Sequence, residues 1–169
     1  MAYLLQHLLT DSAARRPGRP ALAAGGRSLT YSELDRLTNQ VARALLAQGV
    51  APGDRVGVFG PKSAASVVGI FGALKAGACY VPLDPSAPAE RLSVIMRDSG
   101  IAVVLADLAR APGAAAMADS VPQLRSVIEV GPTGATSAWE QPELRHRTWP
   151  SCPGTRCWRN RTARLPRSW

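Results

Sequence analysis

Residues 74–84 read Leu-Lys-Ala-Gly-Ala-Cys-Tyr-Val-Pro-Leu-Asp, and this stretch contains the end of an apolar segment and the start of a predicted strand. The apolar segment before it ends at Gly77, a residue type that commonly ends helices. A strand is predicted to start at Ala78. Pro82 is expected to end that strand after Val81, because proline has no N–H to donate to a sheet. We therefore expect a buried helix and a short strand joined by a tight corner.

The residues before this corner predict a helix, a hairpin and a second helix. Gly25-Gly26 suits the tight turn of a two-stranded hairpin, since both positions can take a positive φ. Ser32, with an acid three residues later at Asp35, predicts the capped start of the second helix, and Gly49 its end. The expected ranges are a helix over 3–14, strands over 21–24 and 27–31, and an amphipathic helix that buries Leu34, Leu37, Val41 and Leu45.

From residue 55 onward, short apolar strands alternate with helices. The helix over 64–76 is apolar around most of its circumference, so it should be largely buried, and Gly69 and Gly72 indicate close packing. The expected strands cover 55–59, 78–81, 102–105 and 126–130, and the later helices cover 87–99 and 111–118. This alternation predicts an α/β fold with a mainly parallel sheet and flanking helices.

Charge divides the chain into two parts. The net charge is +8, yet all 12 acidic residues precede residue 145, and the 25 residues from 145 to 169 contain seven of the 20 basic residues. We expect a globular part over 1–131, followed over 132–169 by a linker and a basic tail that is disordered or frameshifted. A basic tail of this kind could bind nucleic acid, but its prolines and lack of periodicity argue against that function.

The first residues lack the features of a signal peptide, and glycines and a lysine interrupt the best apolar run. Cys79 is expected to be a buried thiol in a reducing compartment. These observations predict a cytoplasmic protein without a membrane partner.

Two local patterns are candidate sites. Gly60-Pro61-Lys62-Ser63 lies between a strand and a helix, where amides could hold an anion, but it lacks the order of a Walker loop. A plain turn is the alternative. Cys152 and Cys157 near His146 do not complete a zinc site. Without a Ser/His/Asp set or a carboxylate pair, the sequence predicts no catalytic, cofactor-binding or metal-binding residue.

Two motifs resemble a known family. Leu29-Thr30-Tyr31-Ser32-Glu33-Leu34 and the stretch 74–84 are similar to the first two core motifs of the AMP-forming acyl-activating enzymes. That family includes the adenylation domains of nonribosomal peptide synthetases and the acyl-CoA ligases. The resemblance extends over residues 1 to about 131. Tyr31, Lys75 and Tyr80 match motif positions, but none is a usual catalytic residue of the family.

The resemblance implies a partial N-terminal subdomain of an adenylate-forming enzyme. Full-length members activate a carboxylate, such as an amino or fatty acid, with ATP and Mg²⁺. They then transfer the acyl group to the thiol of CoA or phosphopantetheine. The phosphate loop of the family is expected shortly after residue 140 and is not recognisable here. Arg147-Thr148-Trp149-Pro150 can be encoded by DNA that reads Asp-Leu-Ala in another frame, which suggests a frameshift.

Three functions follow as alternatives. The first is a truncated, inactive fragment of an AMP-dependent ligase. The second is a small protein that binds a nucleotide or a partner on the same scaffold. The third is nucleic-acid binding through the Arg/Trp tail. For a fragment we also expect self-association through unpaired sheet edges, because buried elements would lack their neighbours.

Overall fold

The computed structural model describes residues 4–131 and 145–148, with side-chain detail over 4–131 apart from residue 118. A five-stranded sheet in the order β4-β3-β5-β6-β7 forms its centre, and β1 and β2 form a separate hairpin. Strands β3, β4, β5 and β6 run parallel, whereas β7 is antiparallel to β6. The predicted α/β class with a mainly parallel sheet is confirmed.

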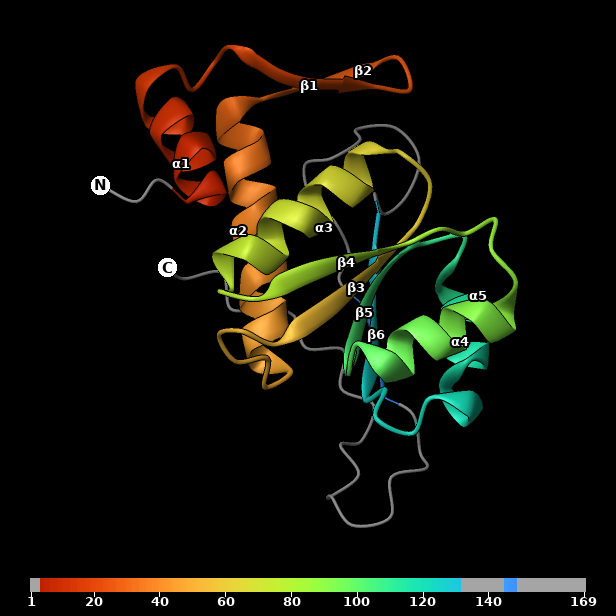
Figure 1. Ribbon diagram of the computed structural model, residues 1–169. Coiled ribbons are helices and arrows are strands. Elements are labelled where there is room, and N and C mark those ends of the chain that lie inside the picture. The colour runs from red at the N-terminus through yellow and green to blue at the C-terminus, as the bar shows by residue number, and fades with distance from the viewer. Residues whose placement is uncertain (1–3, 132–144, 149–169) are drawn as a thin grey trace.

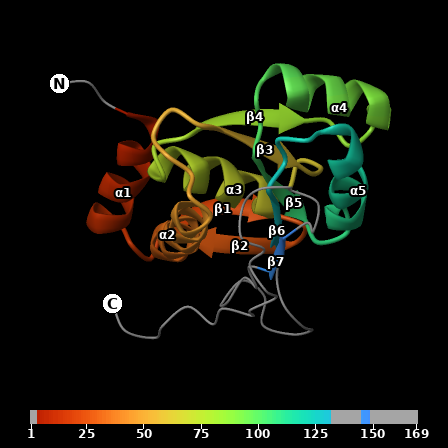
Figure 2. The same cartoon turned by 90° about the horizontal axis from the view of Figure 1, so that it is seen from below.

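Helices cover both faces of the sheet (Figures 1 and 2). Helices α2 and α3, with the hairpin, enclose one core against Val56, Val58 and Leu105, and α1 contributes Leu9. Helices α4 and α5 enclose a second core on the opposite face, against Val104 and Ala106. The helices are α1 (Leu5–Arg15), α2 (Tyr31–Ala47), α3 (Ala64–Lys75), α4 (Ala89–Asp98) and α5 (Ala111–Ala116), with a 3₁₀ turn, η1 (Ala118–Ser120).

The strands agree closely with the predicted ranges. They are β1 (Pro20–Ala24), β2 (Arg27–Thr30), β3 (Arg55–Phe59), β4 (Cys79–Leu83), β5 (Val103–Asp107), β6 (Ser126–Val130) and β7 (Arg145–Thr148). The hairpin turn uses Gly25 at φ 57° and Gly26 at φ 76°, as its sequence predicts. Strand β7 falls inside the expected linker and tail, and the rest of that segment lies outside the described residues.

Helices α2 and α3 pack unusually closely at Gly72. A Cβ added to Gly72 would lie 2.6 Å from Cβ of Val41 and 3.3 Å from the carbonyl oxygen of Thr38. Val41 and Thr38 are fully buried on α2, so neither can move aside without disturbing the core. The close packing predicted at Gly72 is therefore confirmed. At Gly69 an added Cβ would only make ordinary contact with Leu105, at 3.4 Å.

The start of α2 differs from the prediction. Thr30, not Ser32, is the N-cap: its hydroxyl accepts from the Glu33 N–H, and the Glu33 carboxylate accepts from the Thr30 N–H at 2.7 Å. The same hydroxyl–acid spacing occurs at Ser32 and Asp35, but the hairpin ends at Thr30, and this fixes the extended backbone that a cap requires. Asp35 is instead one turn into the helix.

The Thr30–Glu33 capping box predicts a pH-dependent stability. The Thr30 N–H bond, followed by the Thr30 hydroxyl, lowers the pKa of Glu33 below its usual value. A lowered folded-state pKa adds stability above the unfolded pKa of about 4.3, and this is lost as pH falls through the folded pKa. Glu33→Gln should therefore reduce the difference between the free energy of unfolding at pH 7 and that at pH 3. Denaturant unfolding at both pH values measures it, and an unchanged difference would contradict the assignment.

The corner at Gly77 is confirmed, but the strand after it is longer than predicted. Pro82 lies inside β4, aligned with Val58 of β3, instead of ending the strand. Cys79 N–H donates to the Asp54 carbonyl of the neighbouring segment, so the N–H of every second residue from Cys79 points toward β3. Pro82 therefore occupies a position whose missing N–H would face away from β3, at the edge of the sheet, and costs no hydrogen bond.

The prediction of a buried Cys79 thiol is wrong: Cys79 is free and exposed. The prediction rested on the position of Cys79 within an expected strand, and strands of a parallel sheet are commonly covered on both faces. Strand β4 is instead an edge strand of the sheet, and Cys79 is its first residue. Within the described part of the chain, no helix is both long and apolar enough to cross a membrane.

Candidate functional site

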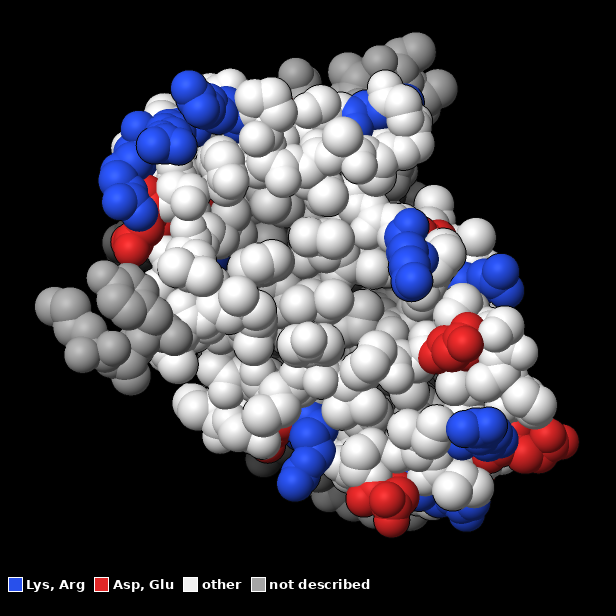
Figure 3. All heavy atoms as spheres, turned by 45° about the horizontal axis from the view of Figure 1, so that its top comes forward, with Lys and Arg blue, Asp and Glu red and all other residues white. Residues whose placement is uncertain are grey.

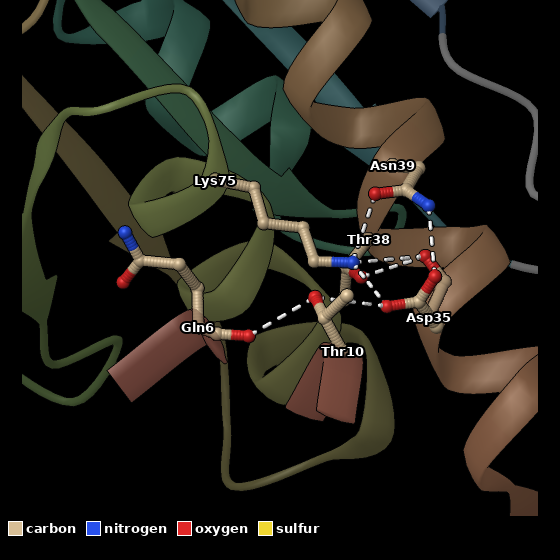
Figure 4. Close-up of polar contacts among 6 residues, drawn as sticks. All are labelled: Gln6, Thr10, Asp35, Thr38, Asn39 and Lys75. Atoms are coloured by element: carbon tan, nitrogen blue, oxygen red, sulfur yellow. Dashed lines mark hydrogen bonds and ion pairs between the residues drawn. The ribbon is translucent and has the colours of Figure 1, made fainter. Parts of the chain in front are cut away.

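A connected group of polar side chains lies where α1, α2 and α3 meet, and we call it the Lys75 cluster (Thr10, Asp35, Asn39 and Lys75). Lys75 lies in the last turn of α3 and donates to Asp35 Oδ1 at 2.6 Å and to Asn39 Oδ1 at 2.8 Å. It also lies 3.3 Å from the Asp35 carbonyl oxygen. Figure 4 shows its ammonium group surrounded by these acceptors.

The other members of the cluster hold Asp35 in place. Asn39 donates to Asp35 Oδ2 at 2.9 Å, and the Thr10 hydroxyl lies 3.4 Å from Asp35 Oδ1. The side chains of Lys75 and Asp35 retain only 10% and 20% of their exposure. Because the three ammonium hydrogens have three acceptors, this lysine has no free donor for a substrate. The cluster is therefore suited to fixing three helices relative to one another.

The surroundings of the cluster are open hollows, and His7 is among the side chains that line them. Shallow hollows between α1 and α2 flank it, lined by residues that include Gln6, His7, Thr10, Asn39 and Arg43. Among the described side chains, Glu129 of β6 is the buried acid, and it has an interaction partner. The described residues also contain no group of three His, Cys, Asp or Glu side chains arranged to hold a metal ion.

The turn at Gly60-Pro61-Lys62-Ser63 leads from β3 into α3, as predicted. Ser63 is the N-cap of α3, and its hydroxyl accepts from the Ser66 N–H at 3.3 Å. The Ser66 hydroxyl in turn donates to the Pro61 carbonyl at 2.6 Å. Two of the donors at this helix start, the Ser66 N–H and hydroxyl, are thus bonded within the turn, which favours the plain turn over an anion site. Lys62 is exposed.

The other candidate positions do not converge on one site. Tyr31 starts α2 and packs half-buried against the first core, whereas Tyr80 lies in β4 and is 39% exposed. Lys75 acts within its own cluster. The Cys152, Cys157 and His146 pattern and the arginine-rich tail lie outside the residues whose side chains are described.

Sequence reasoning missed the partners of Lys75. The available signal was a single lysine at the end of an otherwise uncharged helix, opposite an Asp35–Asn39 pair spaced four residues apart on α2. A buried ammonium group is normally paired with an opposite charge, so a carboxylate partner is expected for this lysine. Which carboxylate it would be depends on how α2 crosses α3, and the sequence does not specify that.

Known proteins match this chain in sequence over most of its length. The family model for AMP-binding enzymes matches residues 9–162. Tyrocidine synthase 3 of Brevibacillus parabrevis is 36% identical over 134 residues, which is 78% of this chain and 2% of the synthase. The phosphinothricin tripeptide synthetase PhsC of Streptomyces viridochromogenes is 48% identical over 101 residues, or 60% of this chain and 9% of that protein. The chain thus spans a small part of these curated relatives.

Solved structures share the same arrangement of strands and helices. The anthranilate CoA ligase AuaEII, in complex with anthranoyl-AMP, superposes with a TM-score of 0.70 and 26% identity over 76% of this chain and 25% of the ligase. The nonribosomal peptide synthetase FmoA3 gives a TM-score of 0.65 at 34% identity, over 66% of this chain and 13% of that protein. From its sequence match and its fold, the chain belongs to the AMP-binding enzyme family of adenylate-forming synthetases and ligases.

Proposed function

We propose that this chain is the N-terminal scaffold segment of an AMP-forming ligase and does not catalyse adenylation by itself. In the full-length enzyme, a carboxylate would react with ATP to form an acyl-adenylate, and the acyl group would then pass to a pantetheine thiol. The proposal rests on the match of the family model over residues 9–162. It is supported by Lys75, a residue of the second motif, whose ammonium group binds Asp35 and Asn39 of α2.

The described residues do not fit the cofactors that the whole enzyme would use. ATP, Mg²⁺ and a CoA or phosphopantetheine thiol need amide donors, cations and carboxylates gathered in one place. The described residues offer no metal-holding group, and in the turn before α3 the Ser66 N–H and hydroxyl are already bonded to Ser63 and Pro61. No catalytic step is therefore assigned to the residues that the structure describes. A cytoplasmic location is part of the proposal.

The proposal predicts no ATP–pyrophosphate exchange by the purified chain. The assay would offer the twenty amino acids and a series of fatty acids with MgATP, and a full-length adenylation domain would serve as the positive control. Circular dichroism on the same sample would show that the chain is folded. Exchange well above the no-enzyme background would contradict the proposal.

The same samples discriminate the alternative functions. Calorimetric titration with ATP and AMP would detect a nucleotide-binding protein that lacks ligase activity. Binding to DNA that weakens steeply with salt and disappears on deletion of residues 145–169 would indicate a nucleic-acid-binding tail. We expect neither signal, and either one would replace the scaffold proposal by the corresponding binding function.

A further inference from the structure

Strand β6 carries a buried acid next to the edge of the sheet that β7 closes. All five residues of β6 are buried, and Glu129 among them is only 7% exposed. Figure 3, by contrast, shows acidic side chains at the surface, where water solvates their charge. A carboxylate buried in a sheet loses that solvation, so it is costly unless a cation or hydrogen-bond donors lie nearby. Glu129 has an interaction partner, and the strands beside β6 show which cation is within reach along the sheet.

The two strands beside β6 differ in charge at the level of Glu129. In the parallel register with β5, Glu129 is aligned with the uncharged Ala106. In the antiparallel register with β7, which lies beside β6 in Figure 2, it is aligned with Arg145. Residues of opposite charge that lie directly across an antiparallel pair stabilise the pairing. A shift of β7 by one residue would align Glu129 with Leu144 or His146 instead, and neither is a permanent cation.

We propose that the outer edge of β6 is a docking surface for residues 145–148, and that Glu129 selects Arg145 as the residue opposite it. The docked strand begins the most basic part of the chain, since residues 145–169 contain seven basic residues and no acidic one. The inference goes beyond the proposed function, because it concerns the pairing of two strands and requires no ligase activity. It also assigns residues 145–148 to the folded unit, whereas the sequence predicts a linker and a tail there.

The backbone of β6 shows which hydrogen bonds depend on this docking. Ser126 N–H donates to the carbonyl of Ala102, the residue before Val103 of β5. Because N–H directions alternate along a strand, the N–H of Ile128 also faces β5, and those of Val127 and Glu129 face β7. Without an edge strand, these two N–H groups would lack partners within a buried strand, which costs free energy. Residues 145–148 therefore complete the hydrogen bonding of β6.

Hydrogen exchange of the full chain, followed by NMR, tests the docking. We expect the amides of Val127, Ile128 and Glu129 to be protected in the natural chain. Arg147 is aligned with Val127, so its N–H faces β6, and Arg147→Pro should speed exchange at Val127 and Glu129 by at least about tenfold. Ile128 should keep its protection. The matched control is His146→Pro, which removes an N–H that faces away from β6 and should have a much smaller effect.

Charge reversal tests the selection by Glu129. Arg145→Glu places a like charge opposite Glu129 and should speed exchange at Val127 by at least about tenfold, whereas Arg145→Lys should preserve the protection. Arg147→Glu makes the same reversal opposite an apolar residue and should change exchange by less than about threefold. In a Glu129→Gln background the two reversals should become equivalent. Circular dichroism would verify that each variant is folded.

Three results would overturn the proposal. Unprotected amides at Val127 and Glu129 in the natural chain would show that residues 145–148 do not cover the β6 edge. Equal effects of Arg145→Glu and Arg147→Glu in the presence of Glu129 would show that this acid does not select the residue opposite it. Loss of protection at Ile128 together with Val127 in Arg147→Pro would contradict a role confined to the outer edge of β6.

Discussion

Replacing Gly72 by alanine is expected to lower the free energy of unfolding by about 2–4 kcal/mol. The new Cβ would lie 2.6 Å from Cβ of Val41 and 3.3 Å from the Thr38 carbonyl oxygen, so α2 and α3 would have to separate. Both neighbours belong to a fully buried part of α2. Close-packed interiors do not absorb such a shift without losing other contacts. Urea unfolding followed by circular dichroism measures the effect.

Gly113→Ala makes the same chemical change where space is available. Its added Cβ would find only Phe59 Cε1, at 4.0 Å, and Gly113 lies within α5. Since alanine favours a helix over glycine by about 1 kcal/mol, this variant should be neutral or slightly more stable than the natural chain. Equal destabilisation by the two substitutions would contradict the assignment of Gly72 to a close helix contact.

Lys75→Met is expected to cost about 2 kcal/mol of unfolding free energy. The substitution retains most of the apolar stem but removes the charge, and Asp35 would be left 20% exposed without its cation. An uncompensated carboxylate is costly, although the remaining solvent contact of Asp35 moderates the loss. Lys62→Met, at the exposed position before α3, is the control and should change stability by less than about 0.5 kcal/mol.

A double-mutant cycle isolates the Lys75–Asp35 interaction. Unfolding would be measured for Lys75→Met, for Asp35→Asn and for the double variant. We expect a coupling of about 1–2 kcal/mol, because the pair is only partly solvent-exposed and shares the cluster with Asn39. A coupling near zero would show that the cluster does not tie α2 to α3.

Much of this fold is predictable because its signals are local. The turn after α3 at Gly77 and the hairpin at Gly25-Gly26 both depend on positive φ angles that glycine adopts readily. The alternation of short apolar strands with helices leads directly to a parallel sheet. The strands β3 and β6 begin and end at the predicted residues, since turn-forming or polar residues bound both runs.

The wrong predictions concern residues whose environment depends on contacts between distant segments and not on the local sequence. The predictions at Pro82 and Cys79 fail because the environment of both residues depends on β4 being the edge strand, which the sheet order determines. The predicted N-cap is wrong because Thr30–Glu33 and Ser32–Asp35 share one spacing, and only the end of β2 discriminates between them. The Lys75 cluster escapes prediction because its partners are separated by about 40 residues along the chain.

A chimera would show whether this chain can serve as the scaffold of an adenylating enzyme. Residues 1–131 would replace the matching part of an adenylation domain from one of the synthetase relatives, and ATP–pyrophosphate exchange would be measured with that domain's own amino acid. A swap of the same segment from a second relative controls for disruption at the junction. We expect an exchange rate within about tenfold of the parent domain, which corresponds to a rise of about 1.4 kcal/mol in the activation barrier. A folded chimera without exchange, beside an active control swap, would contradict it.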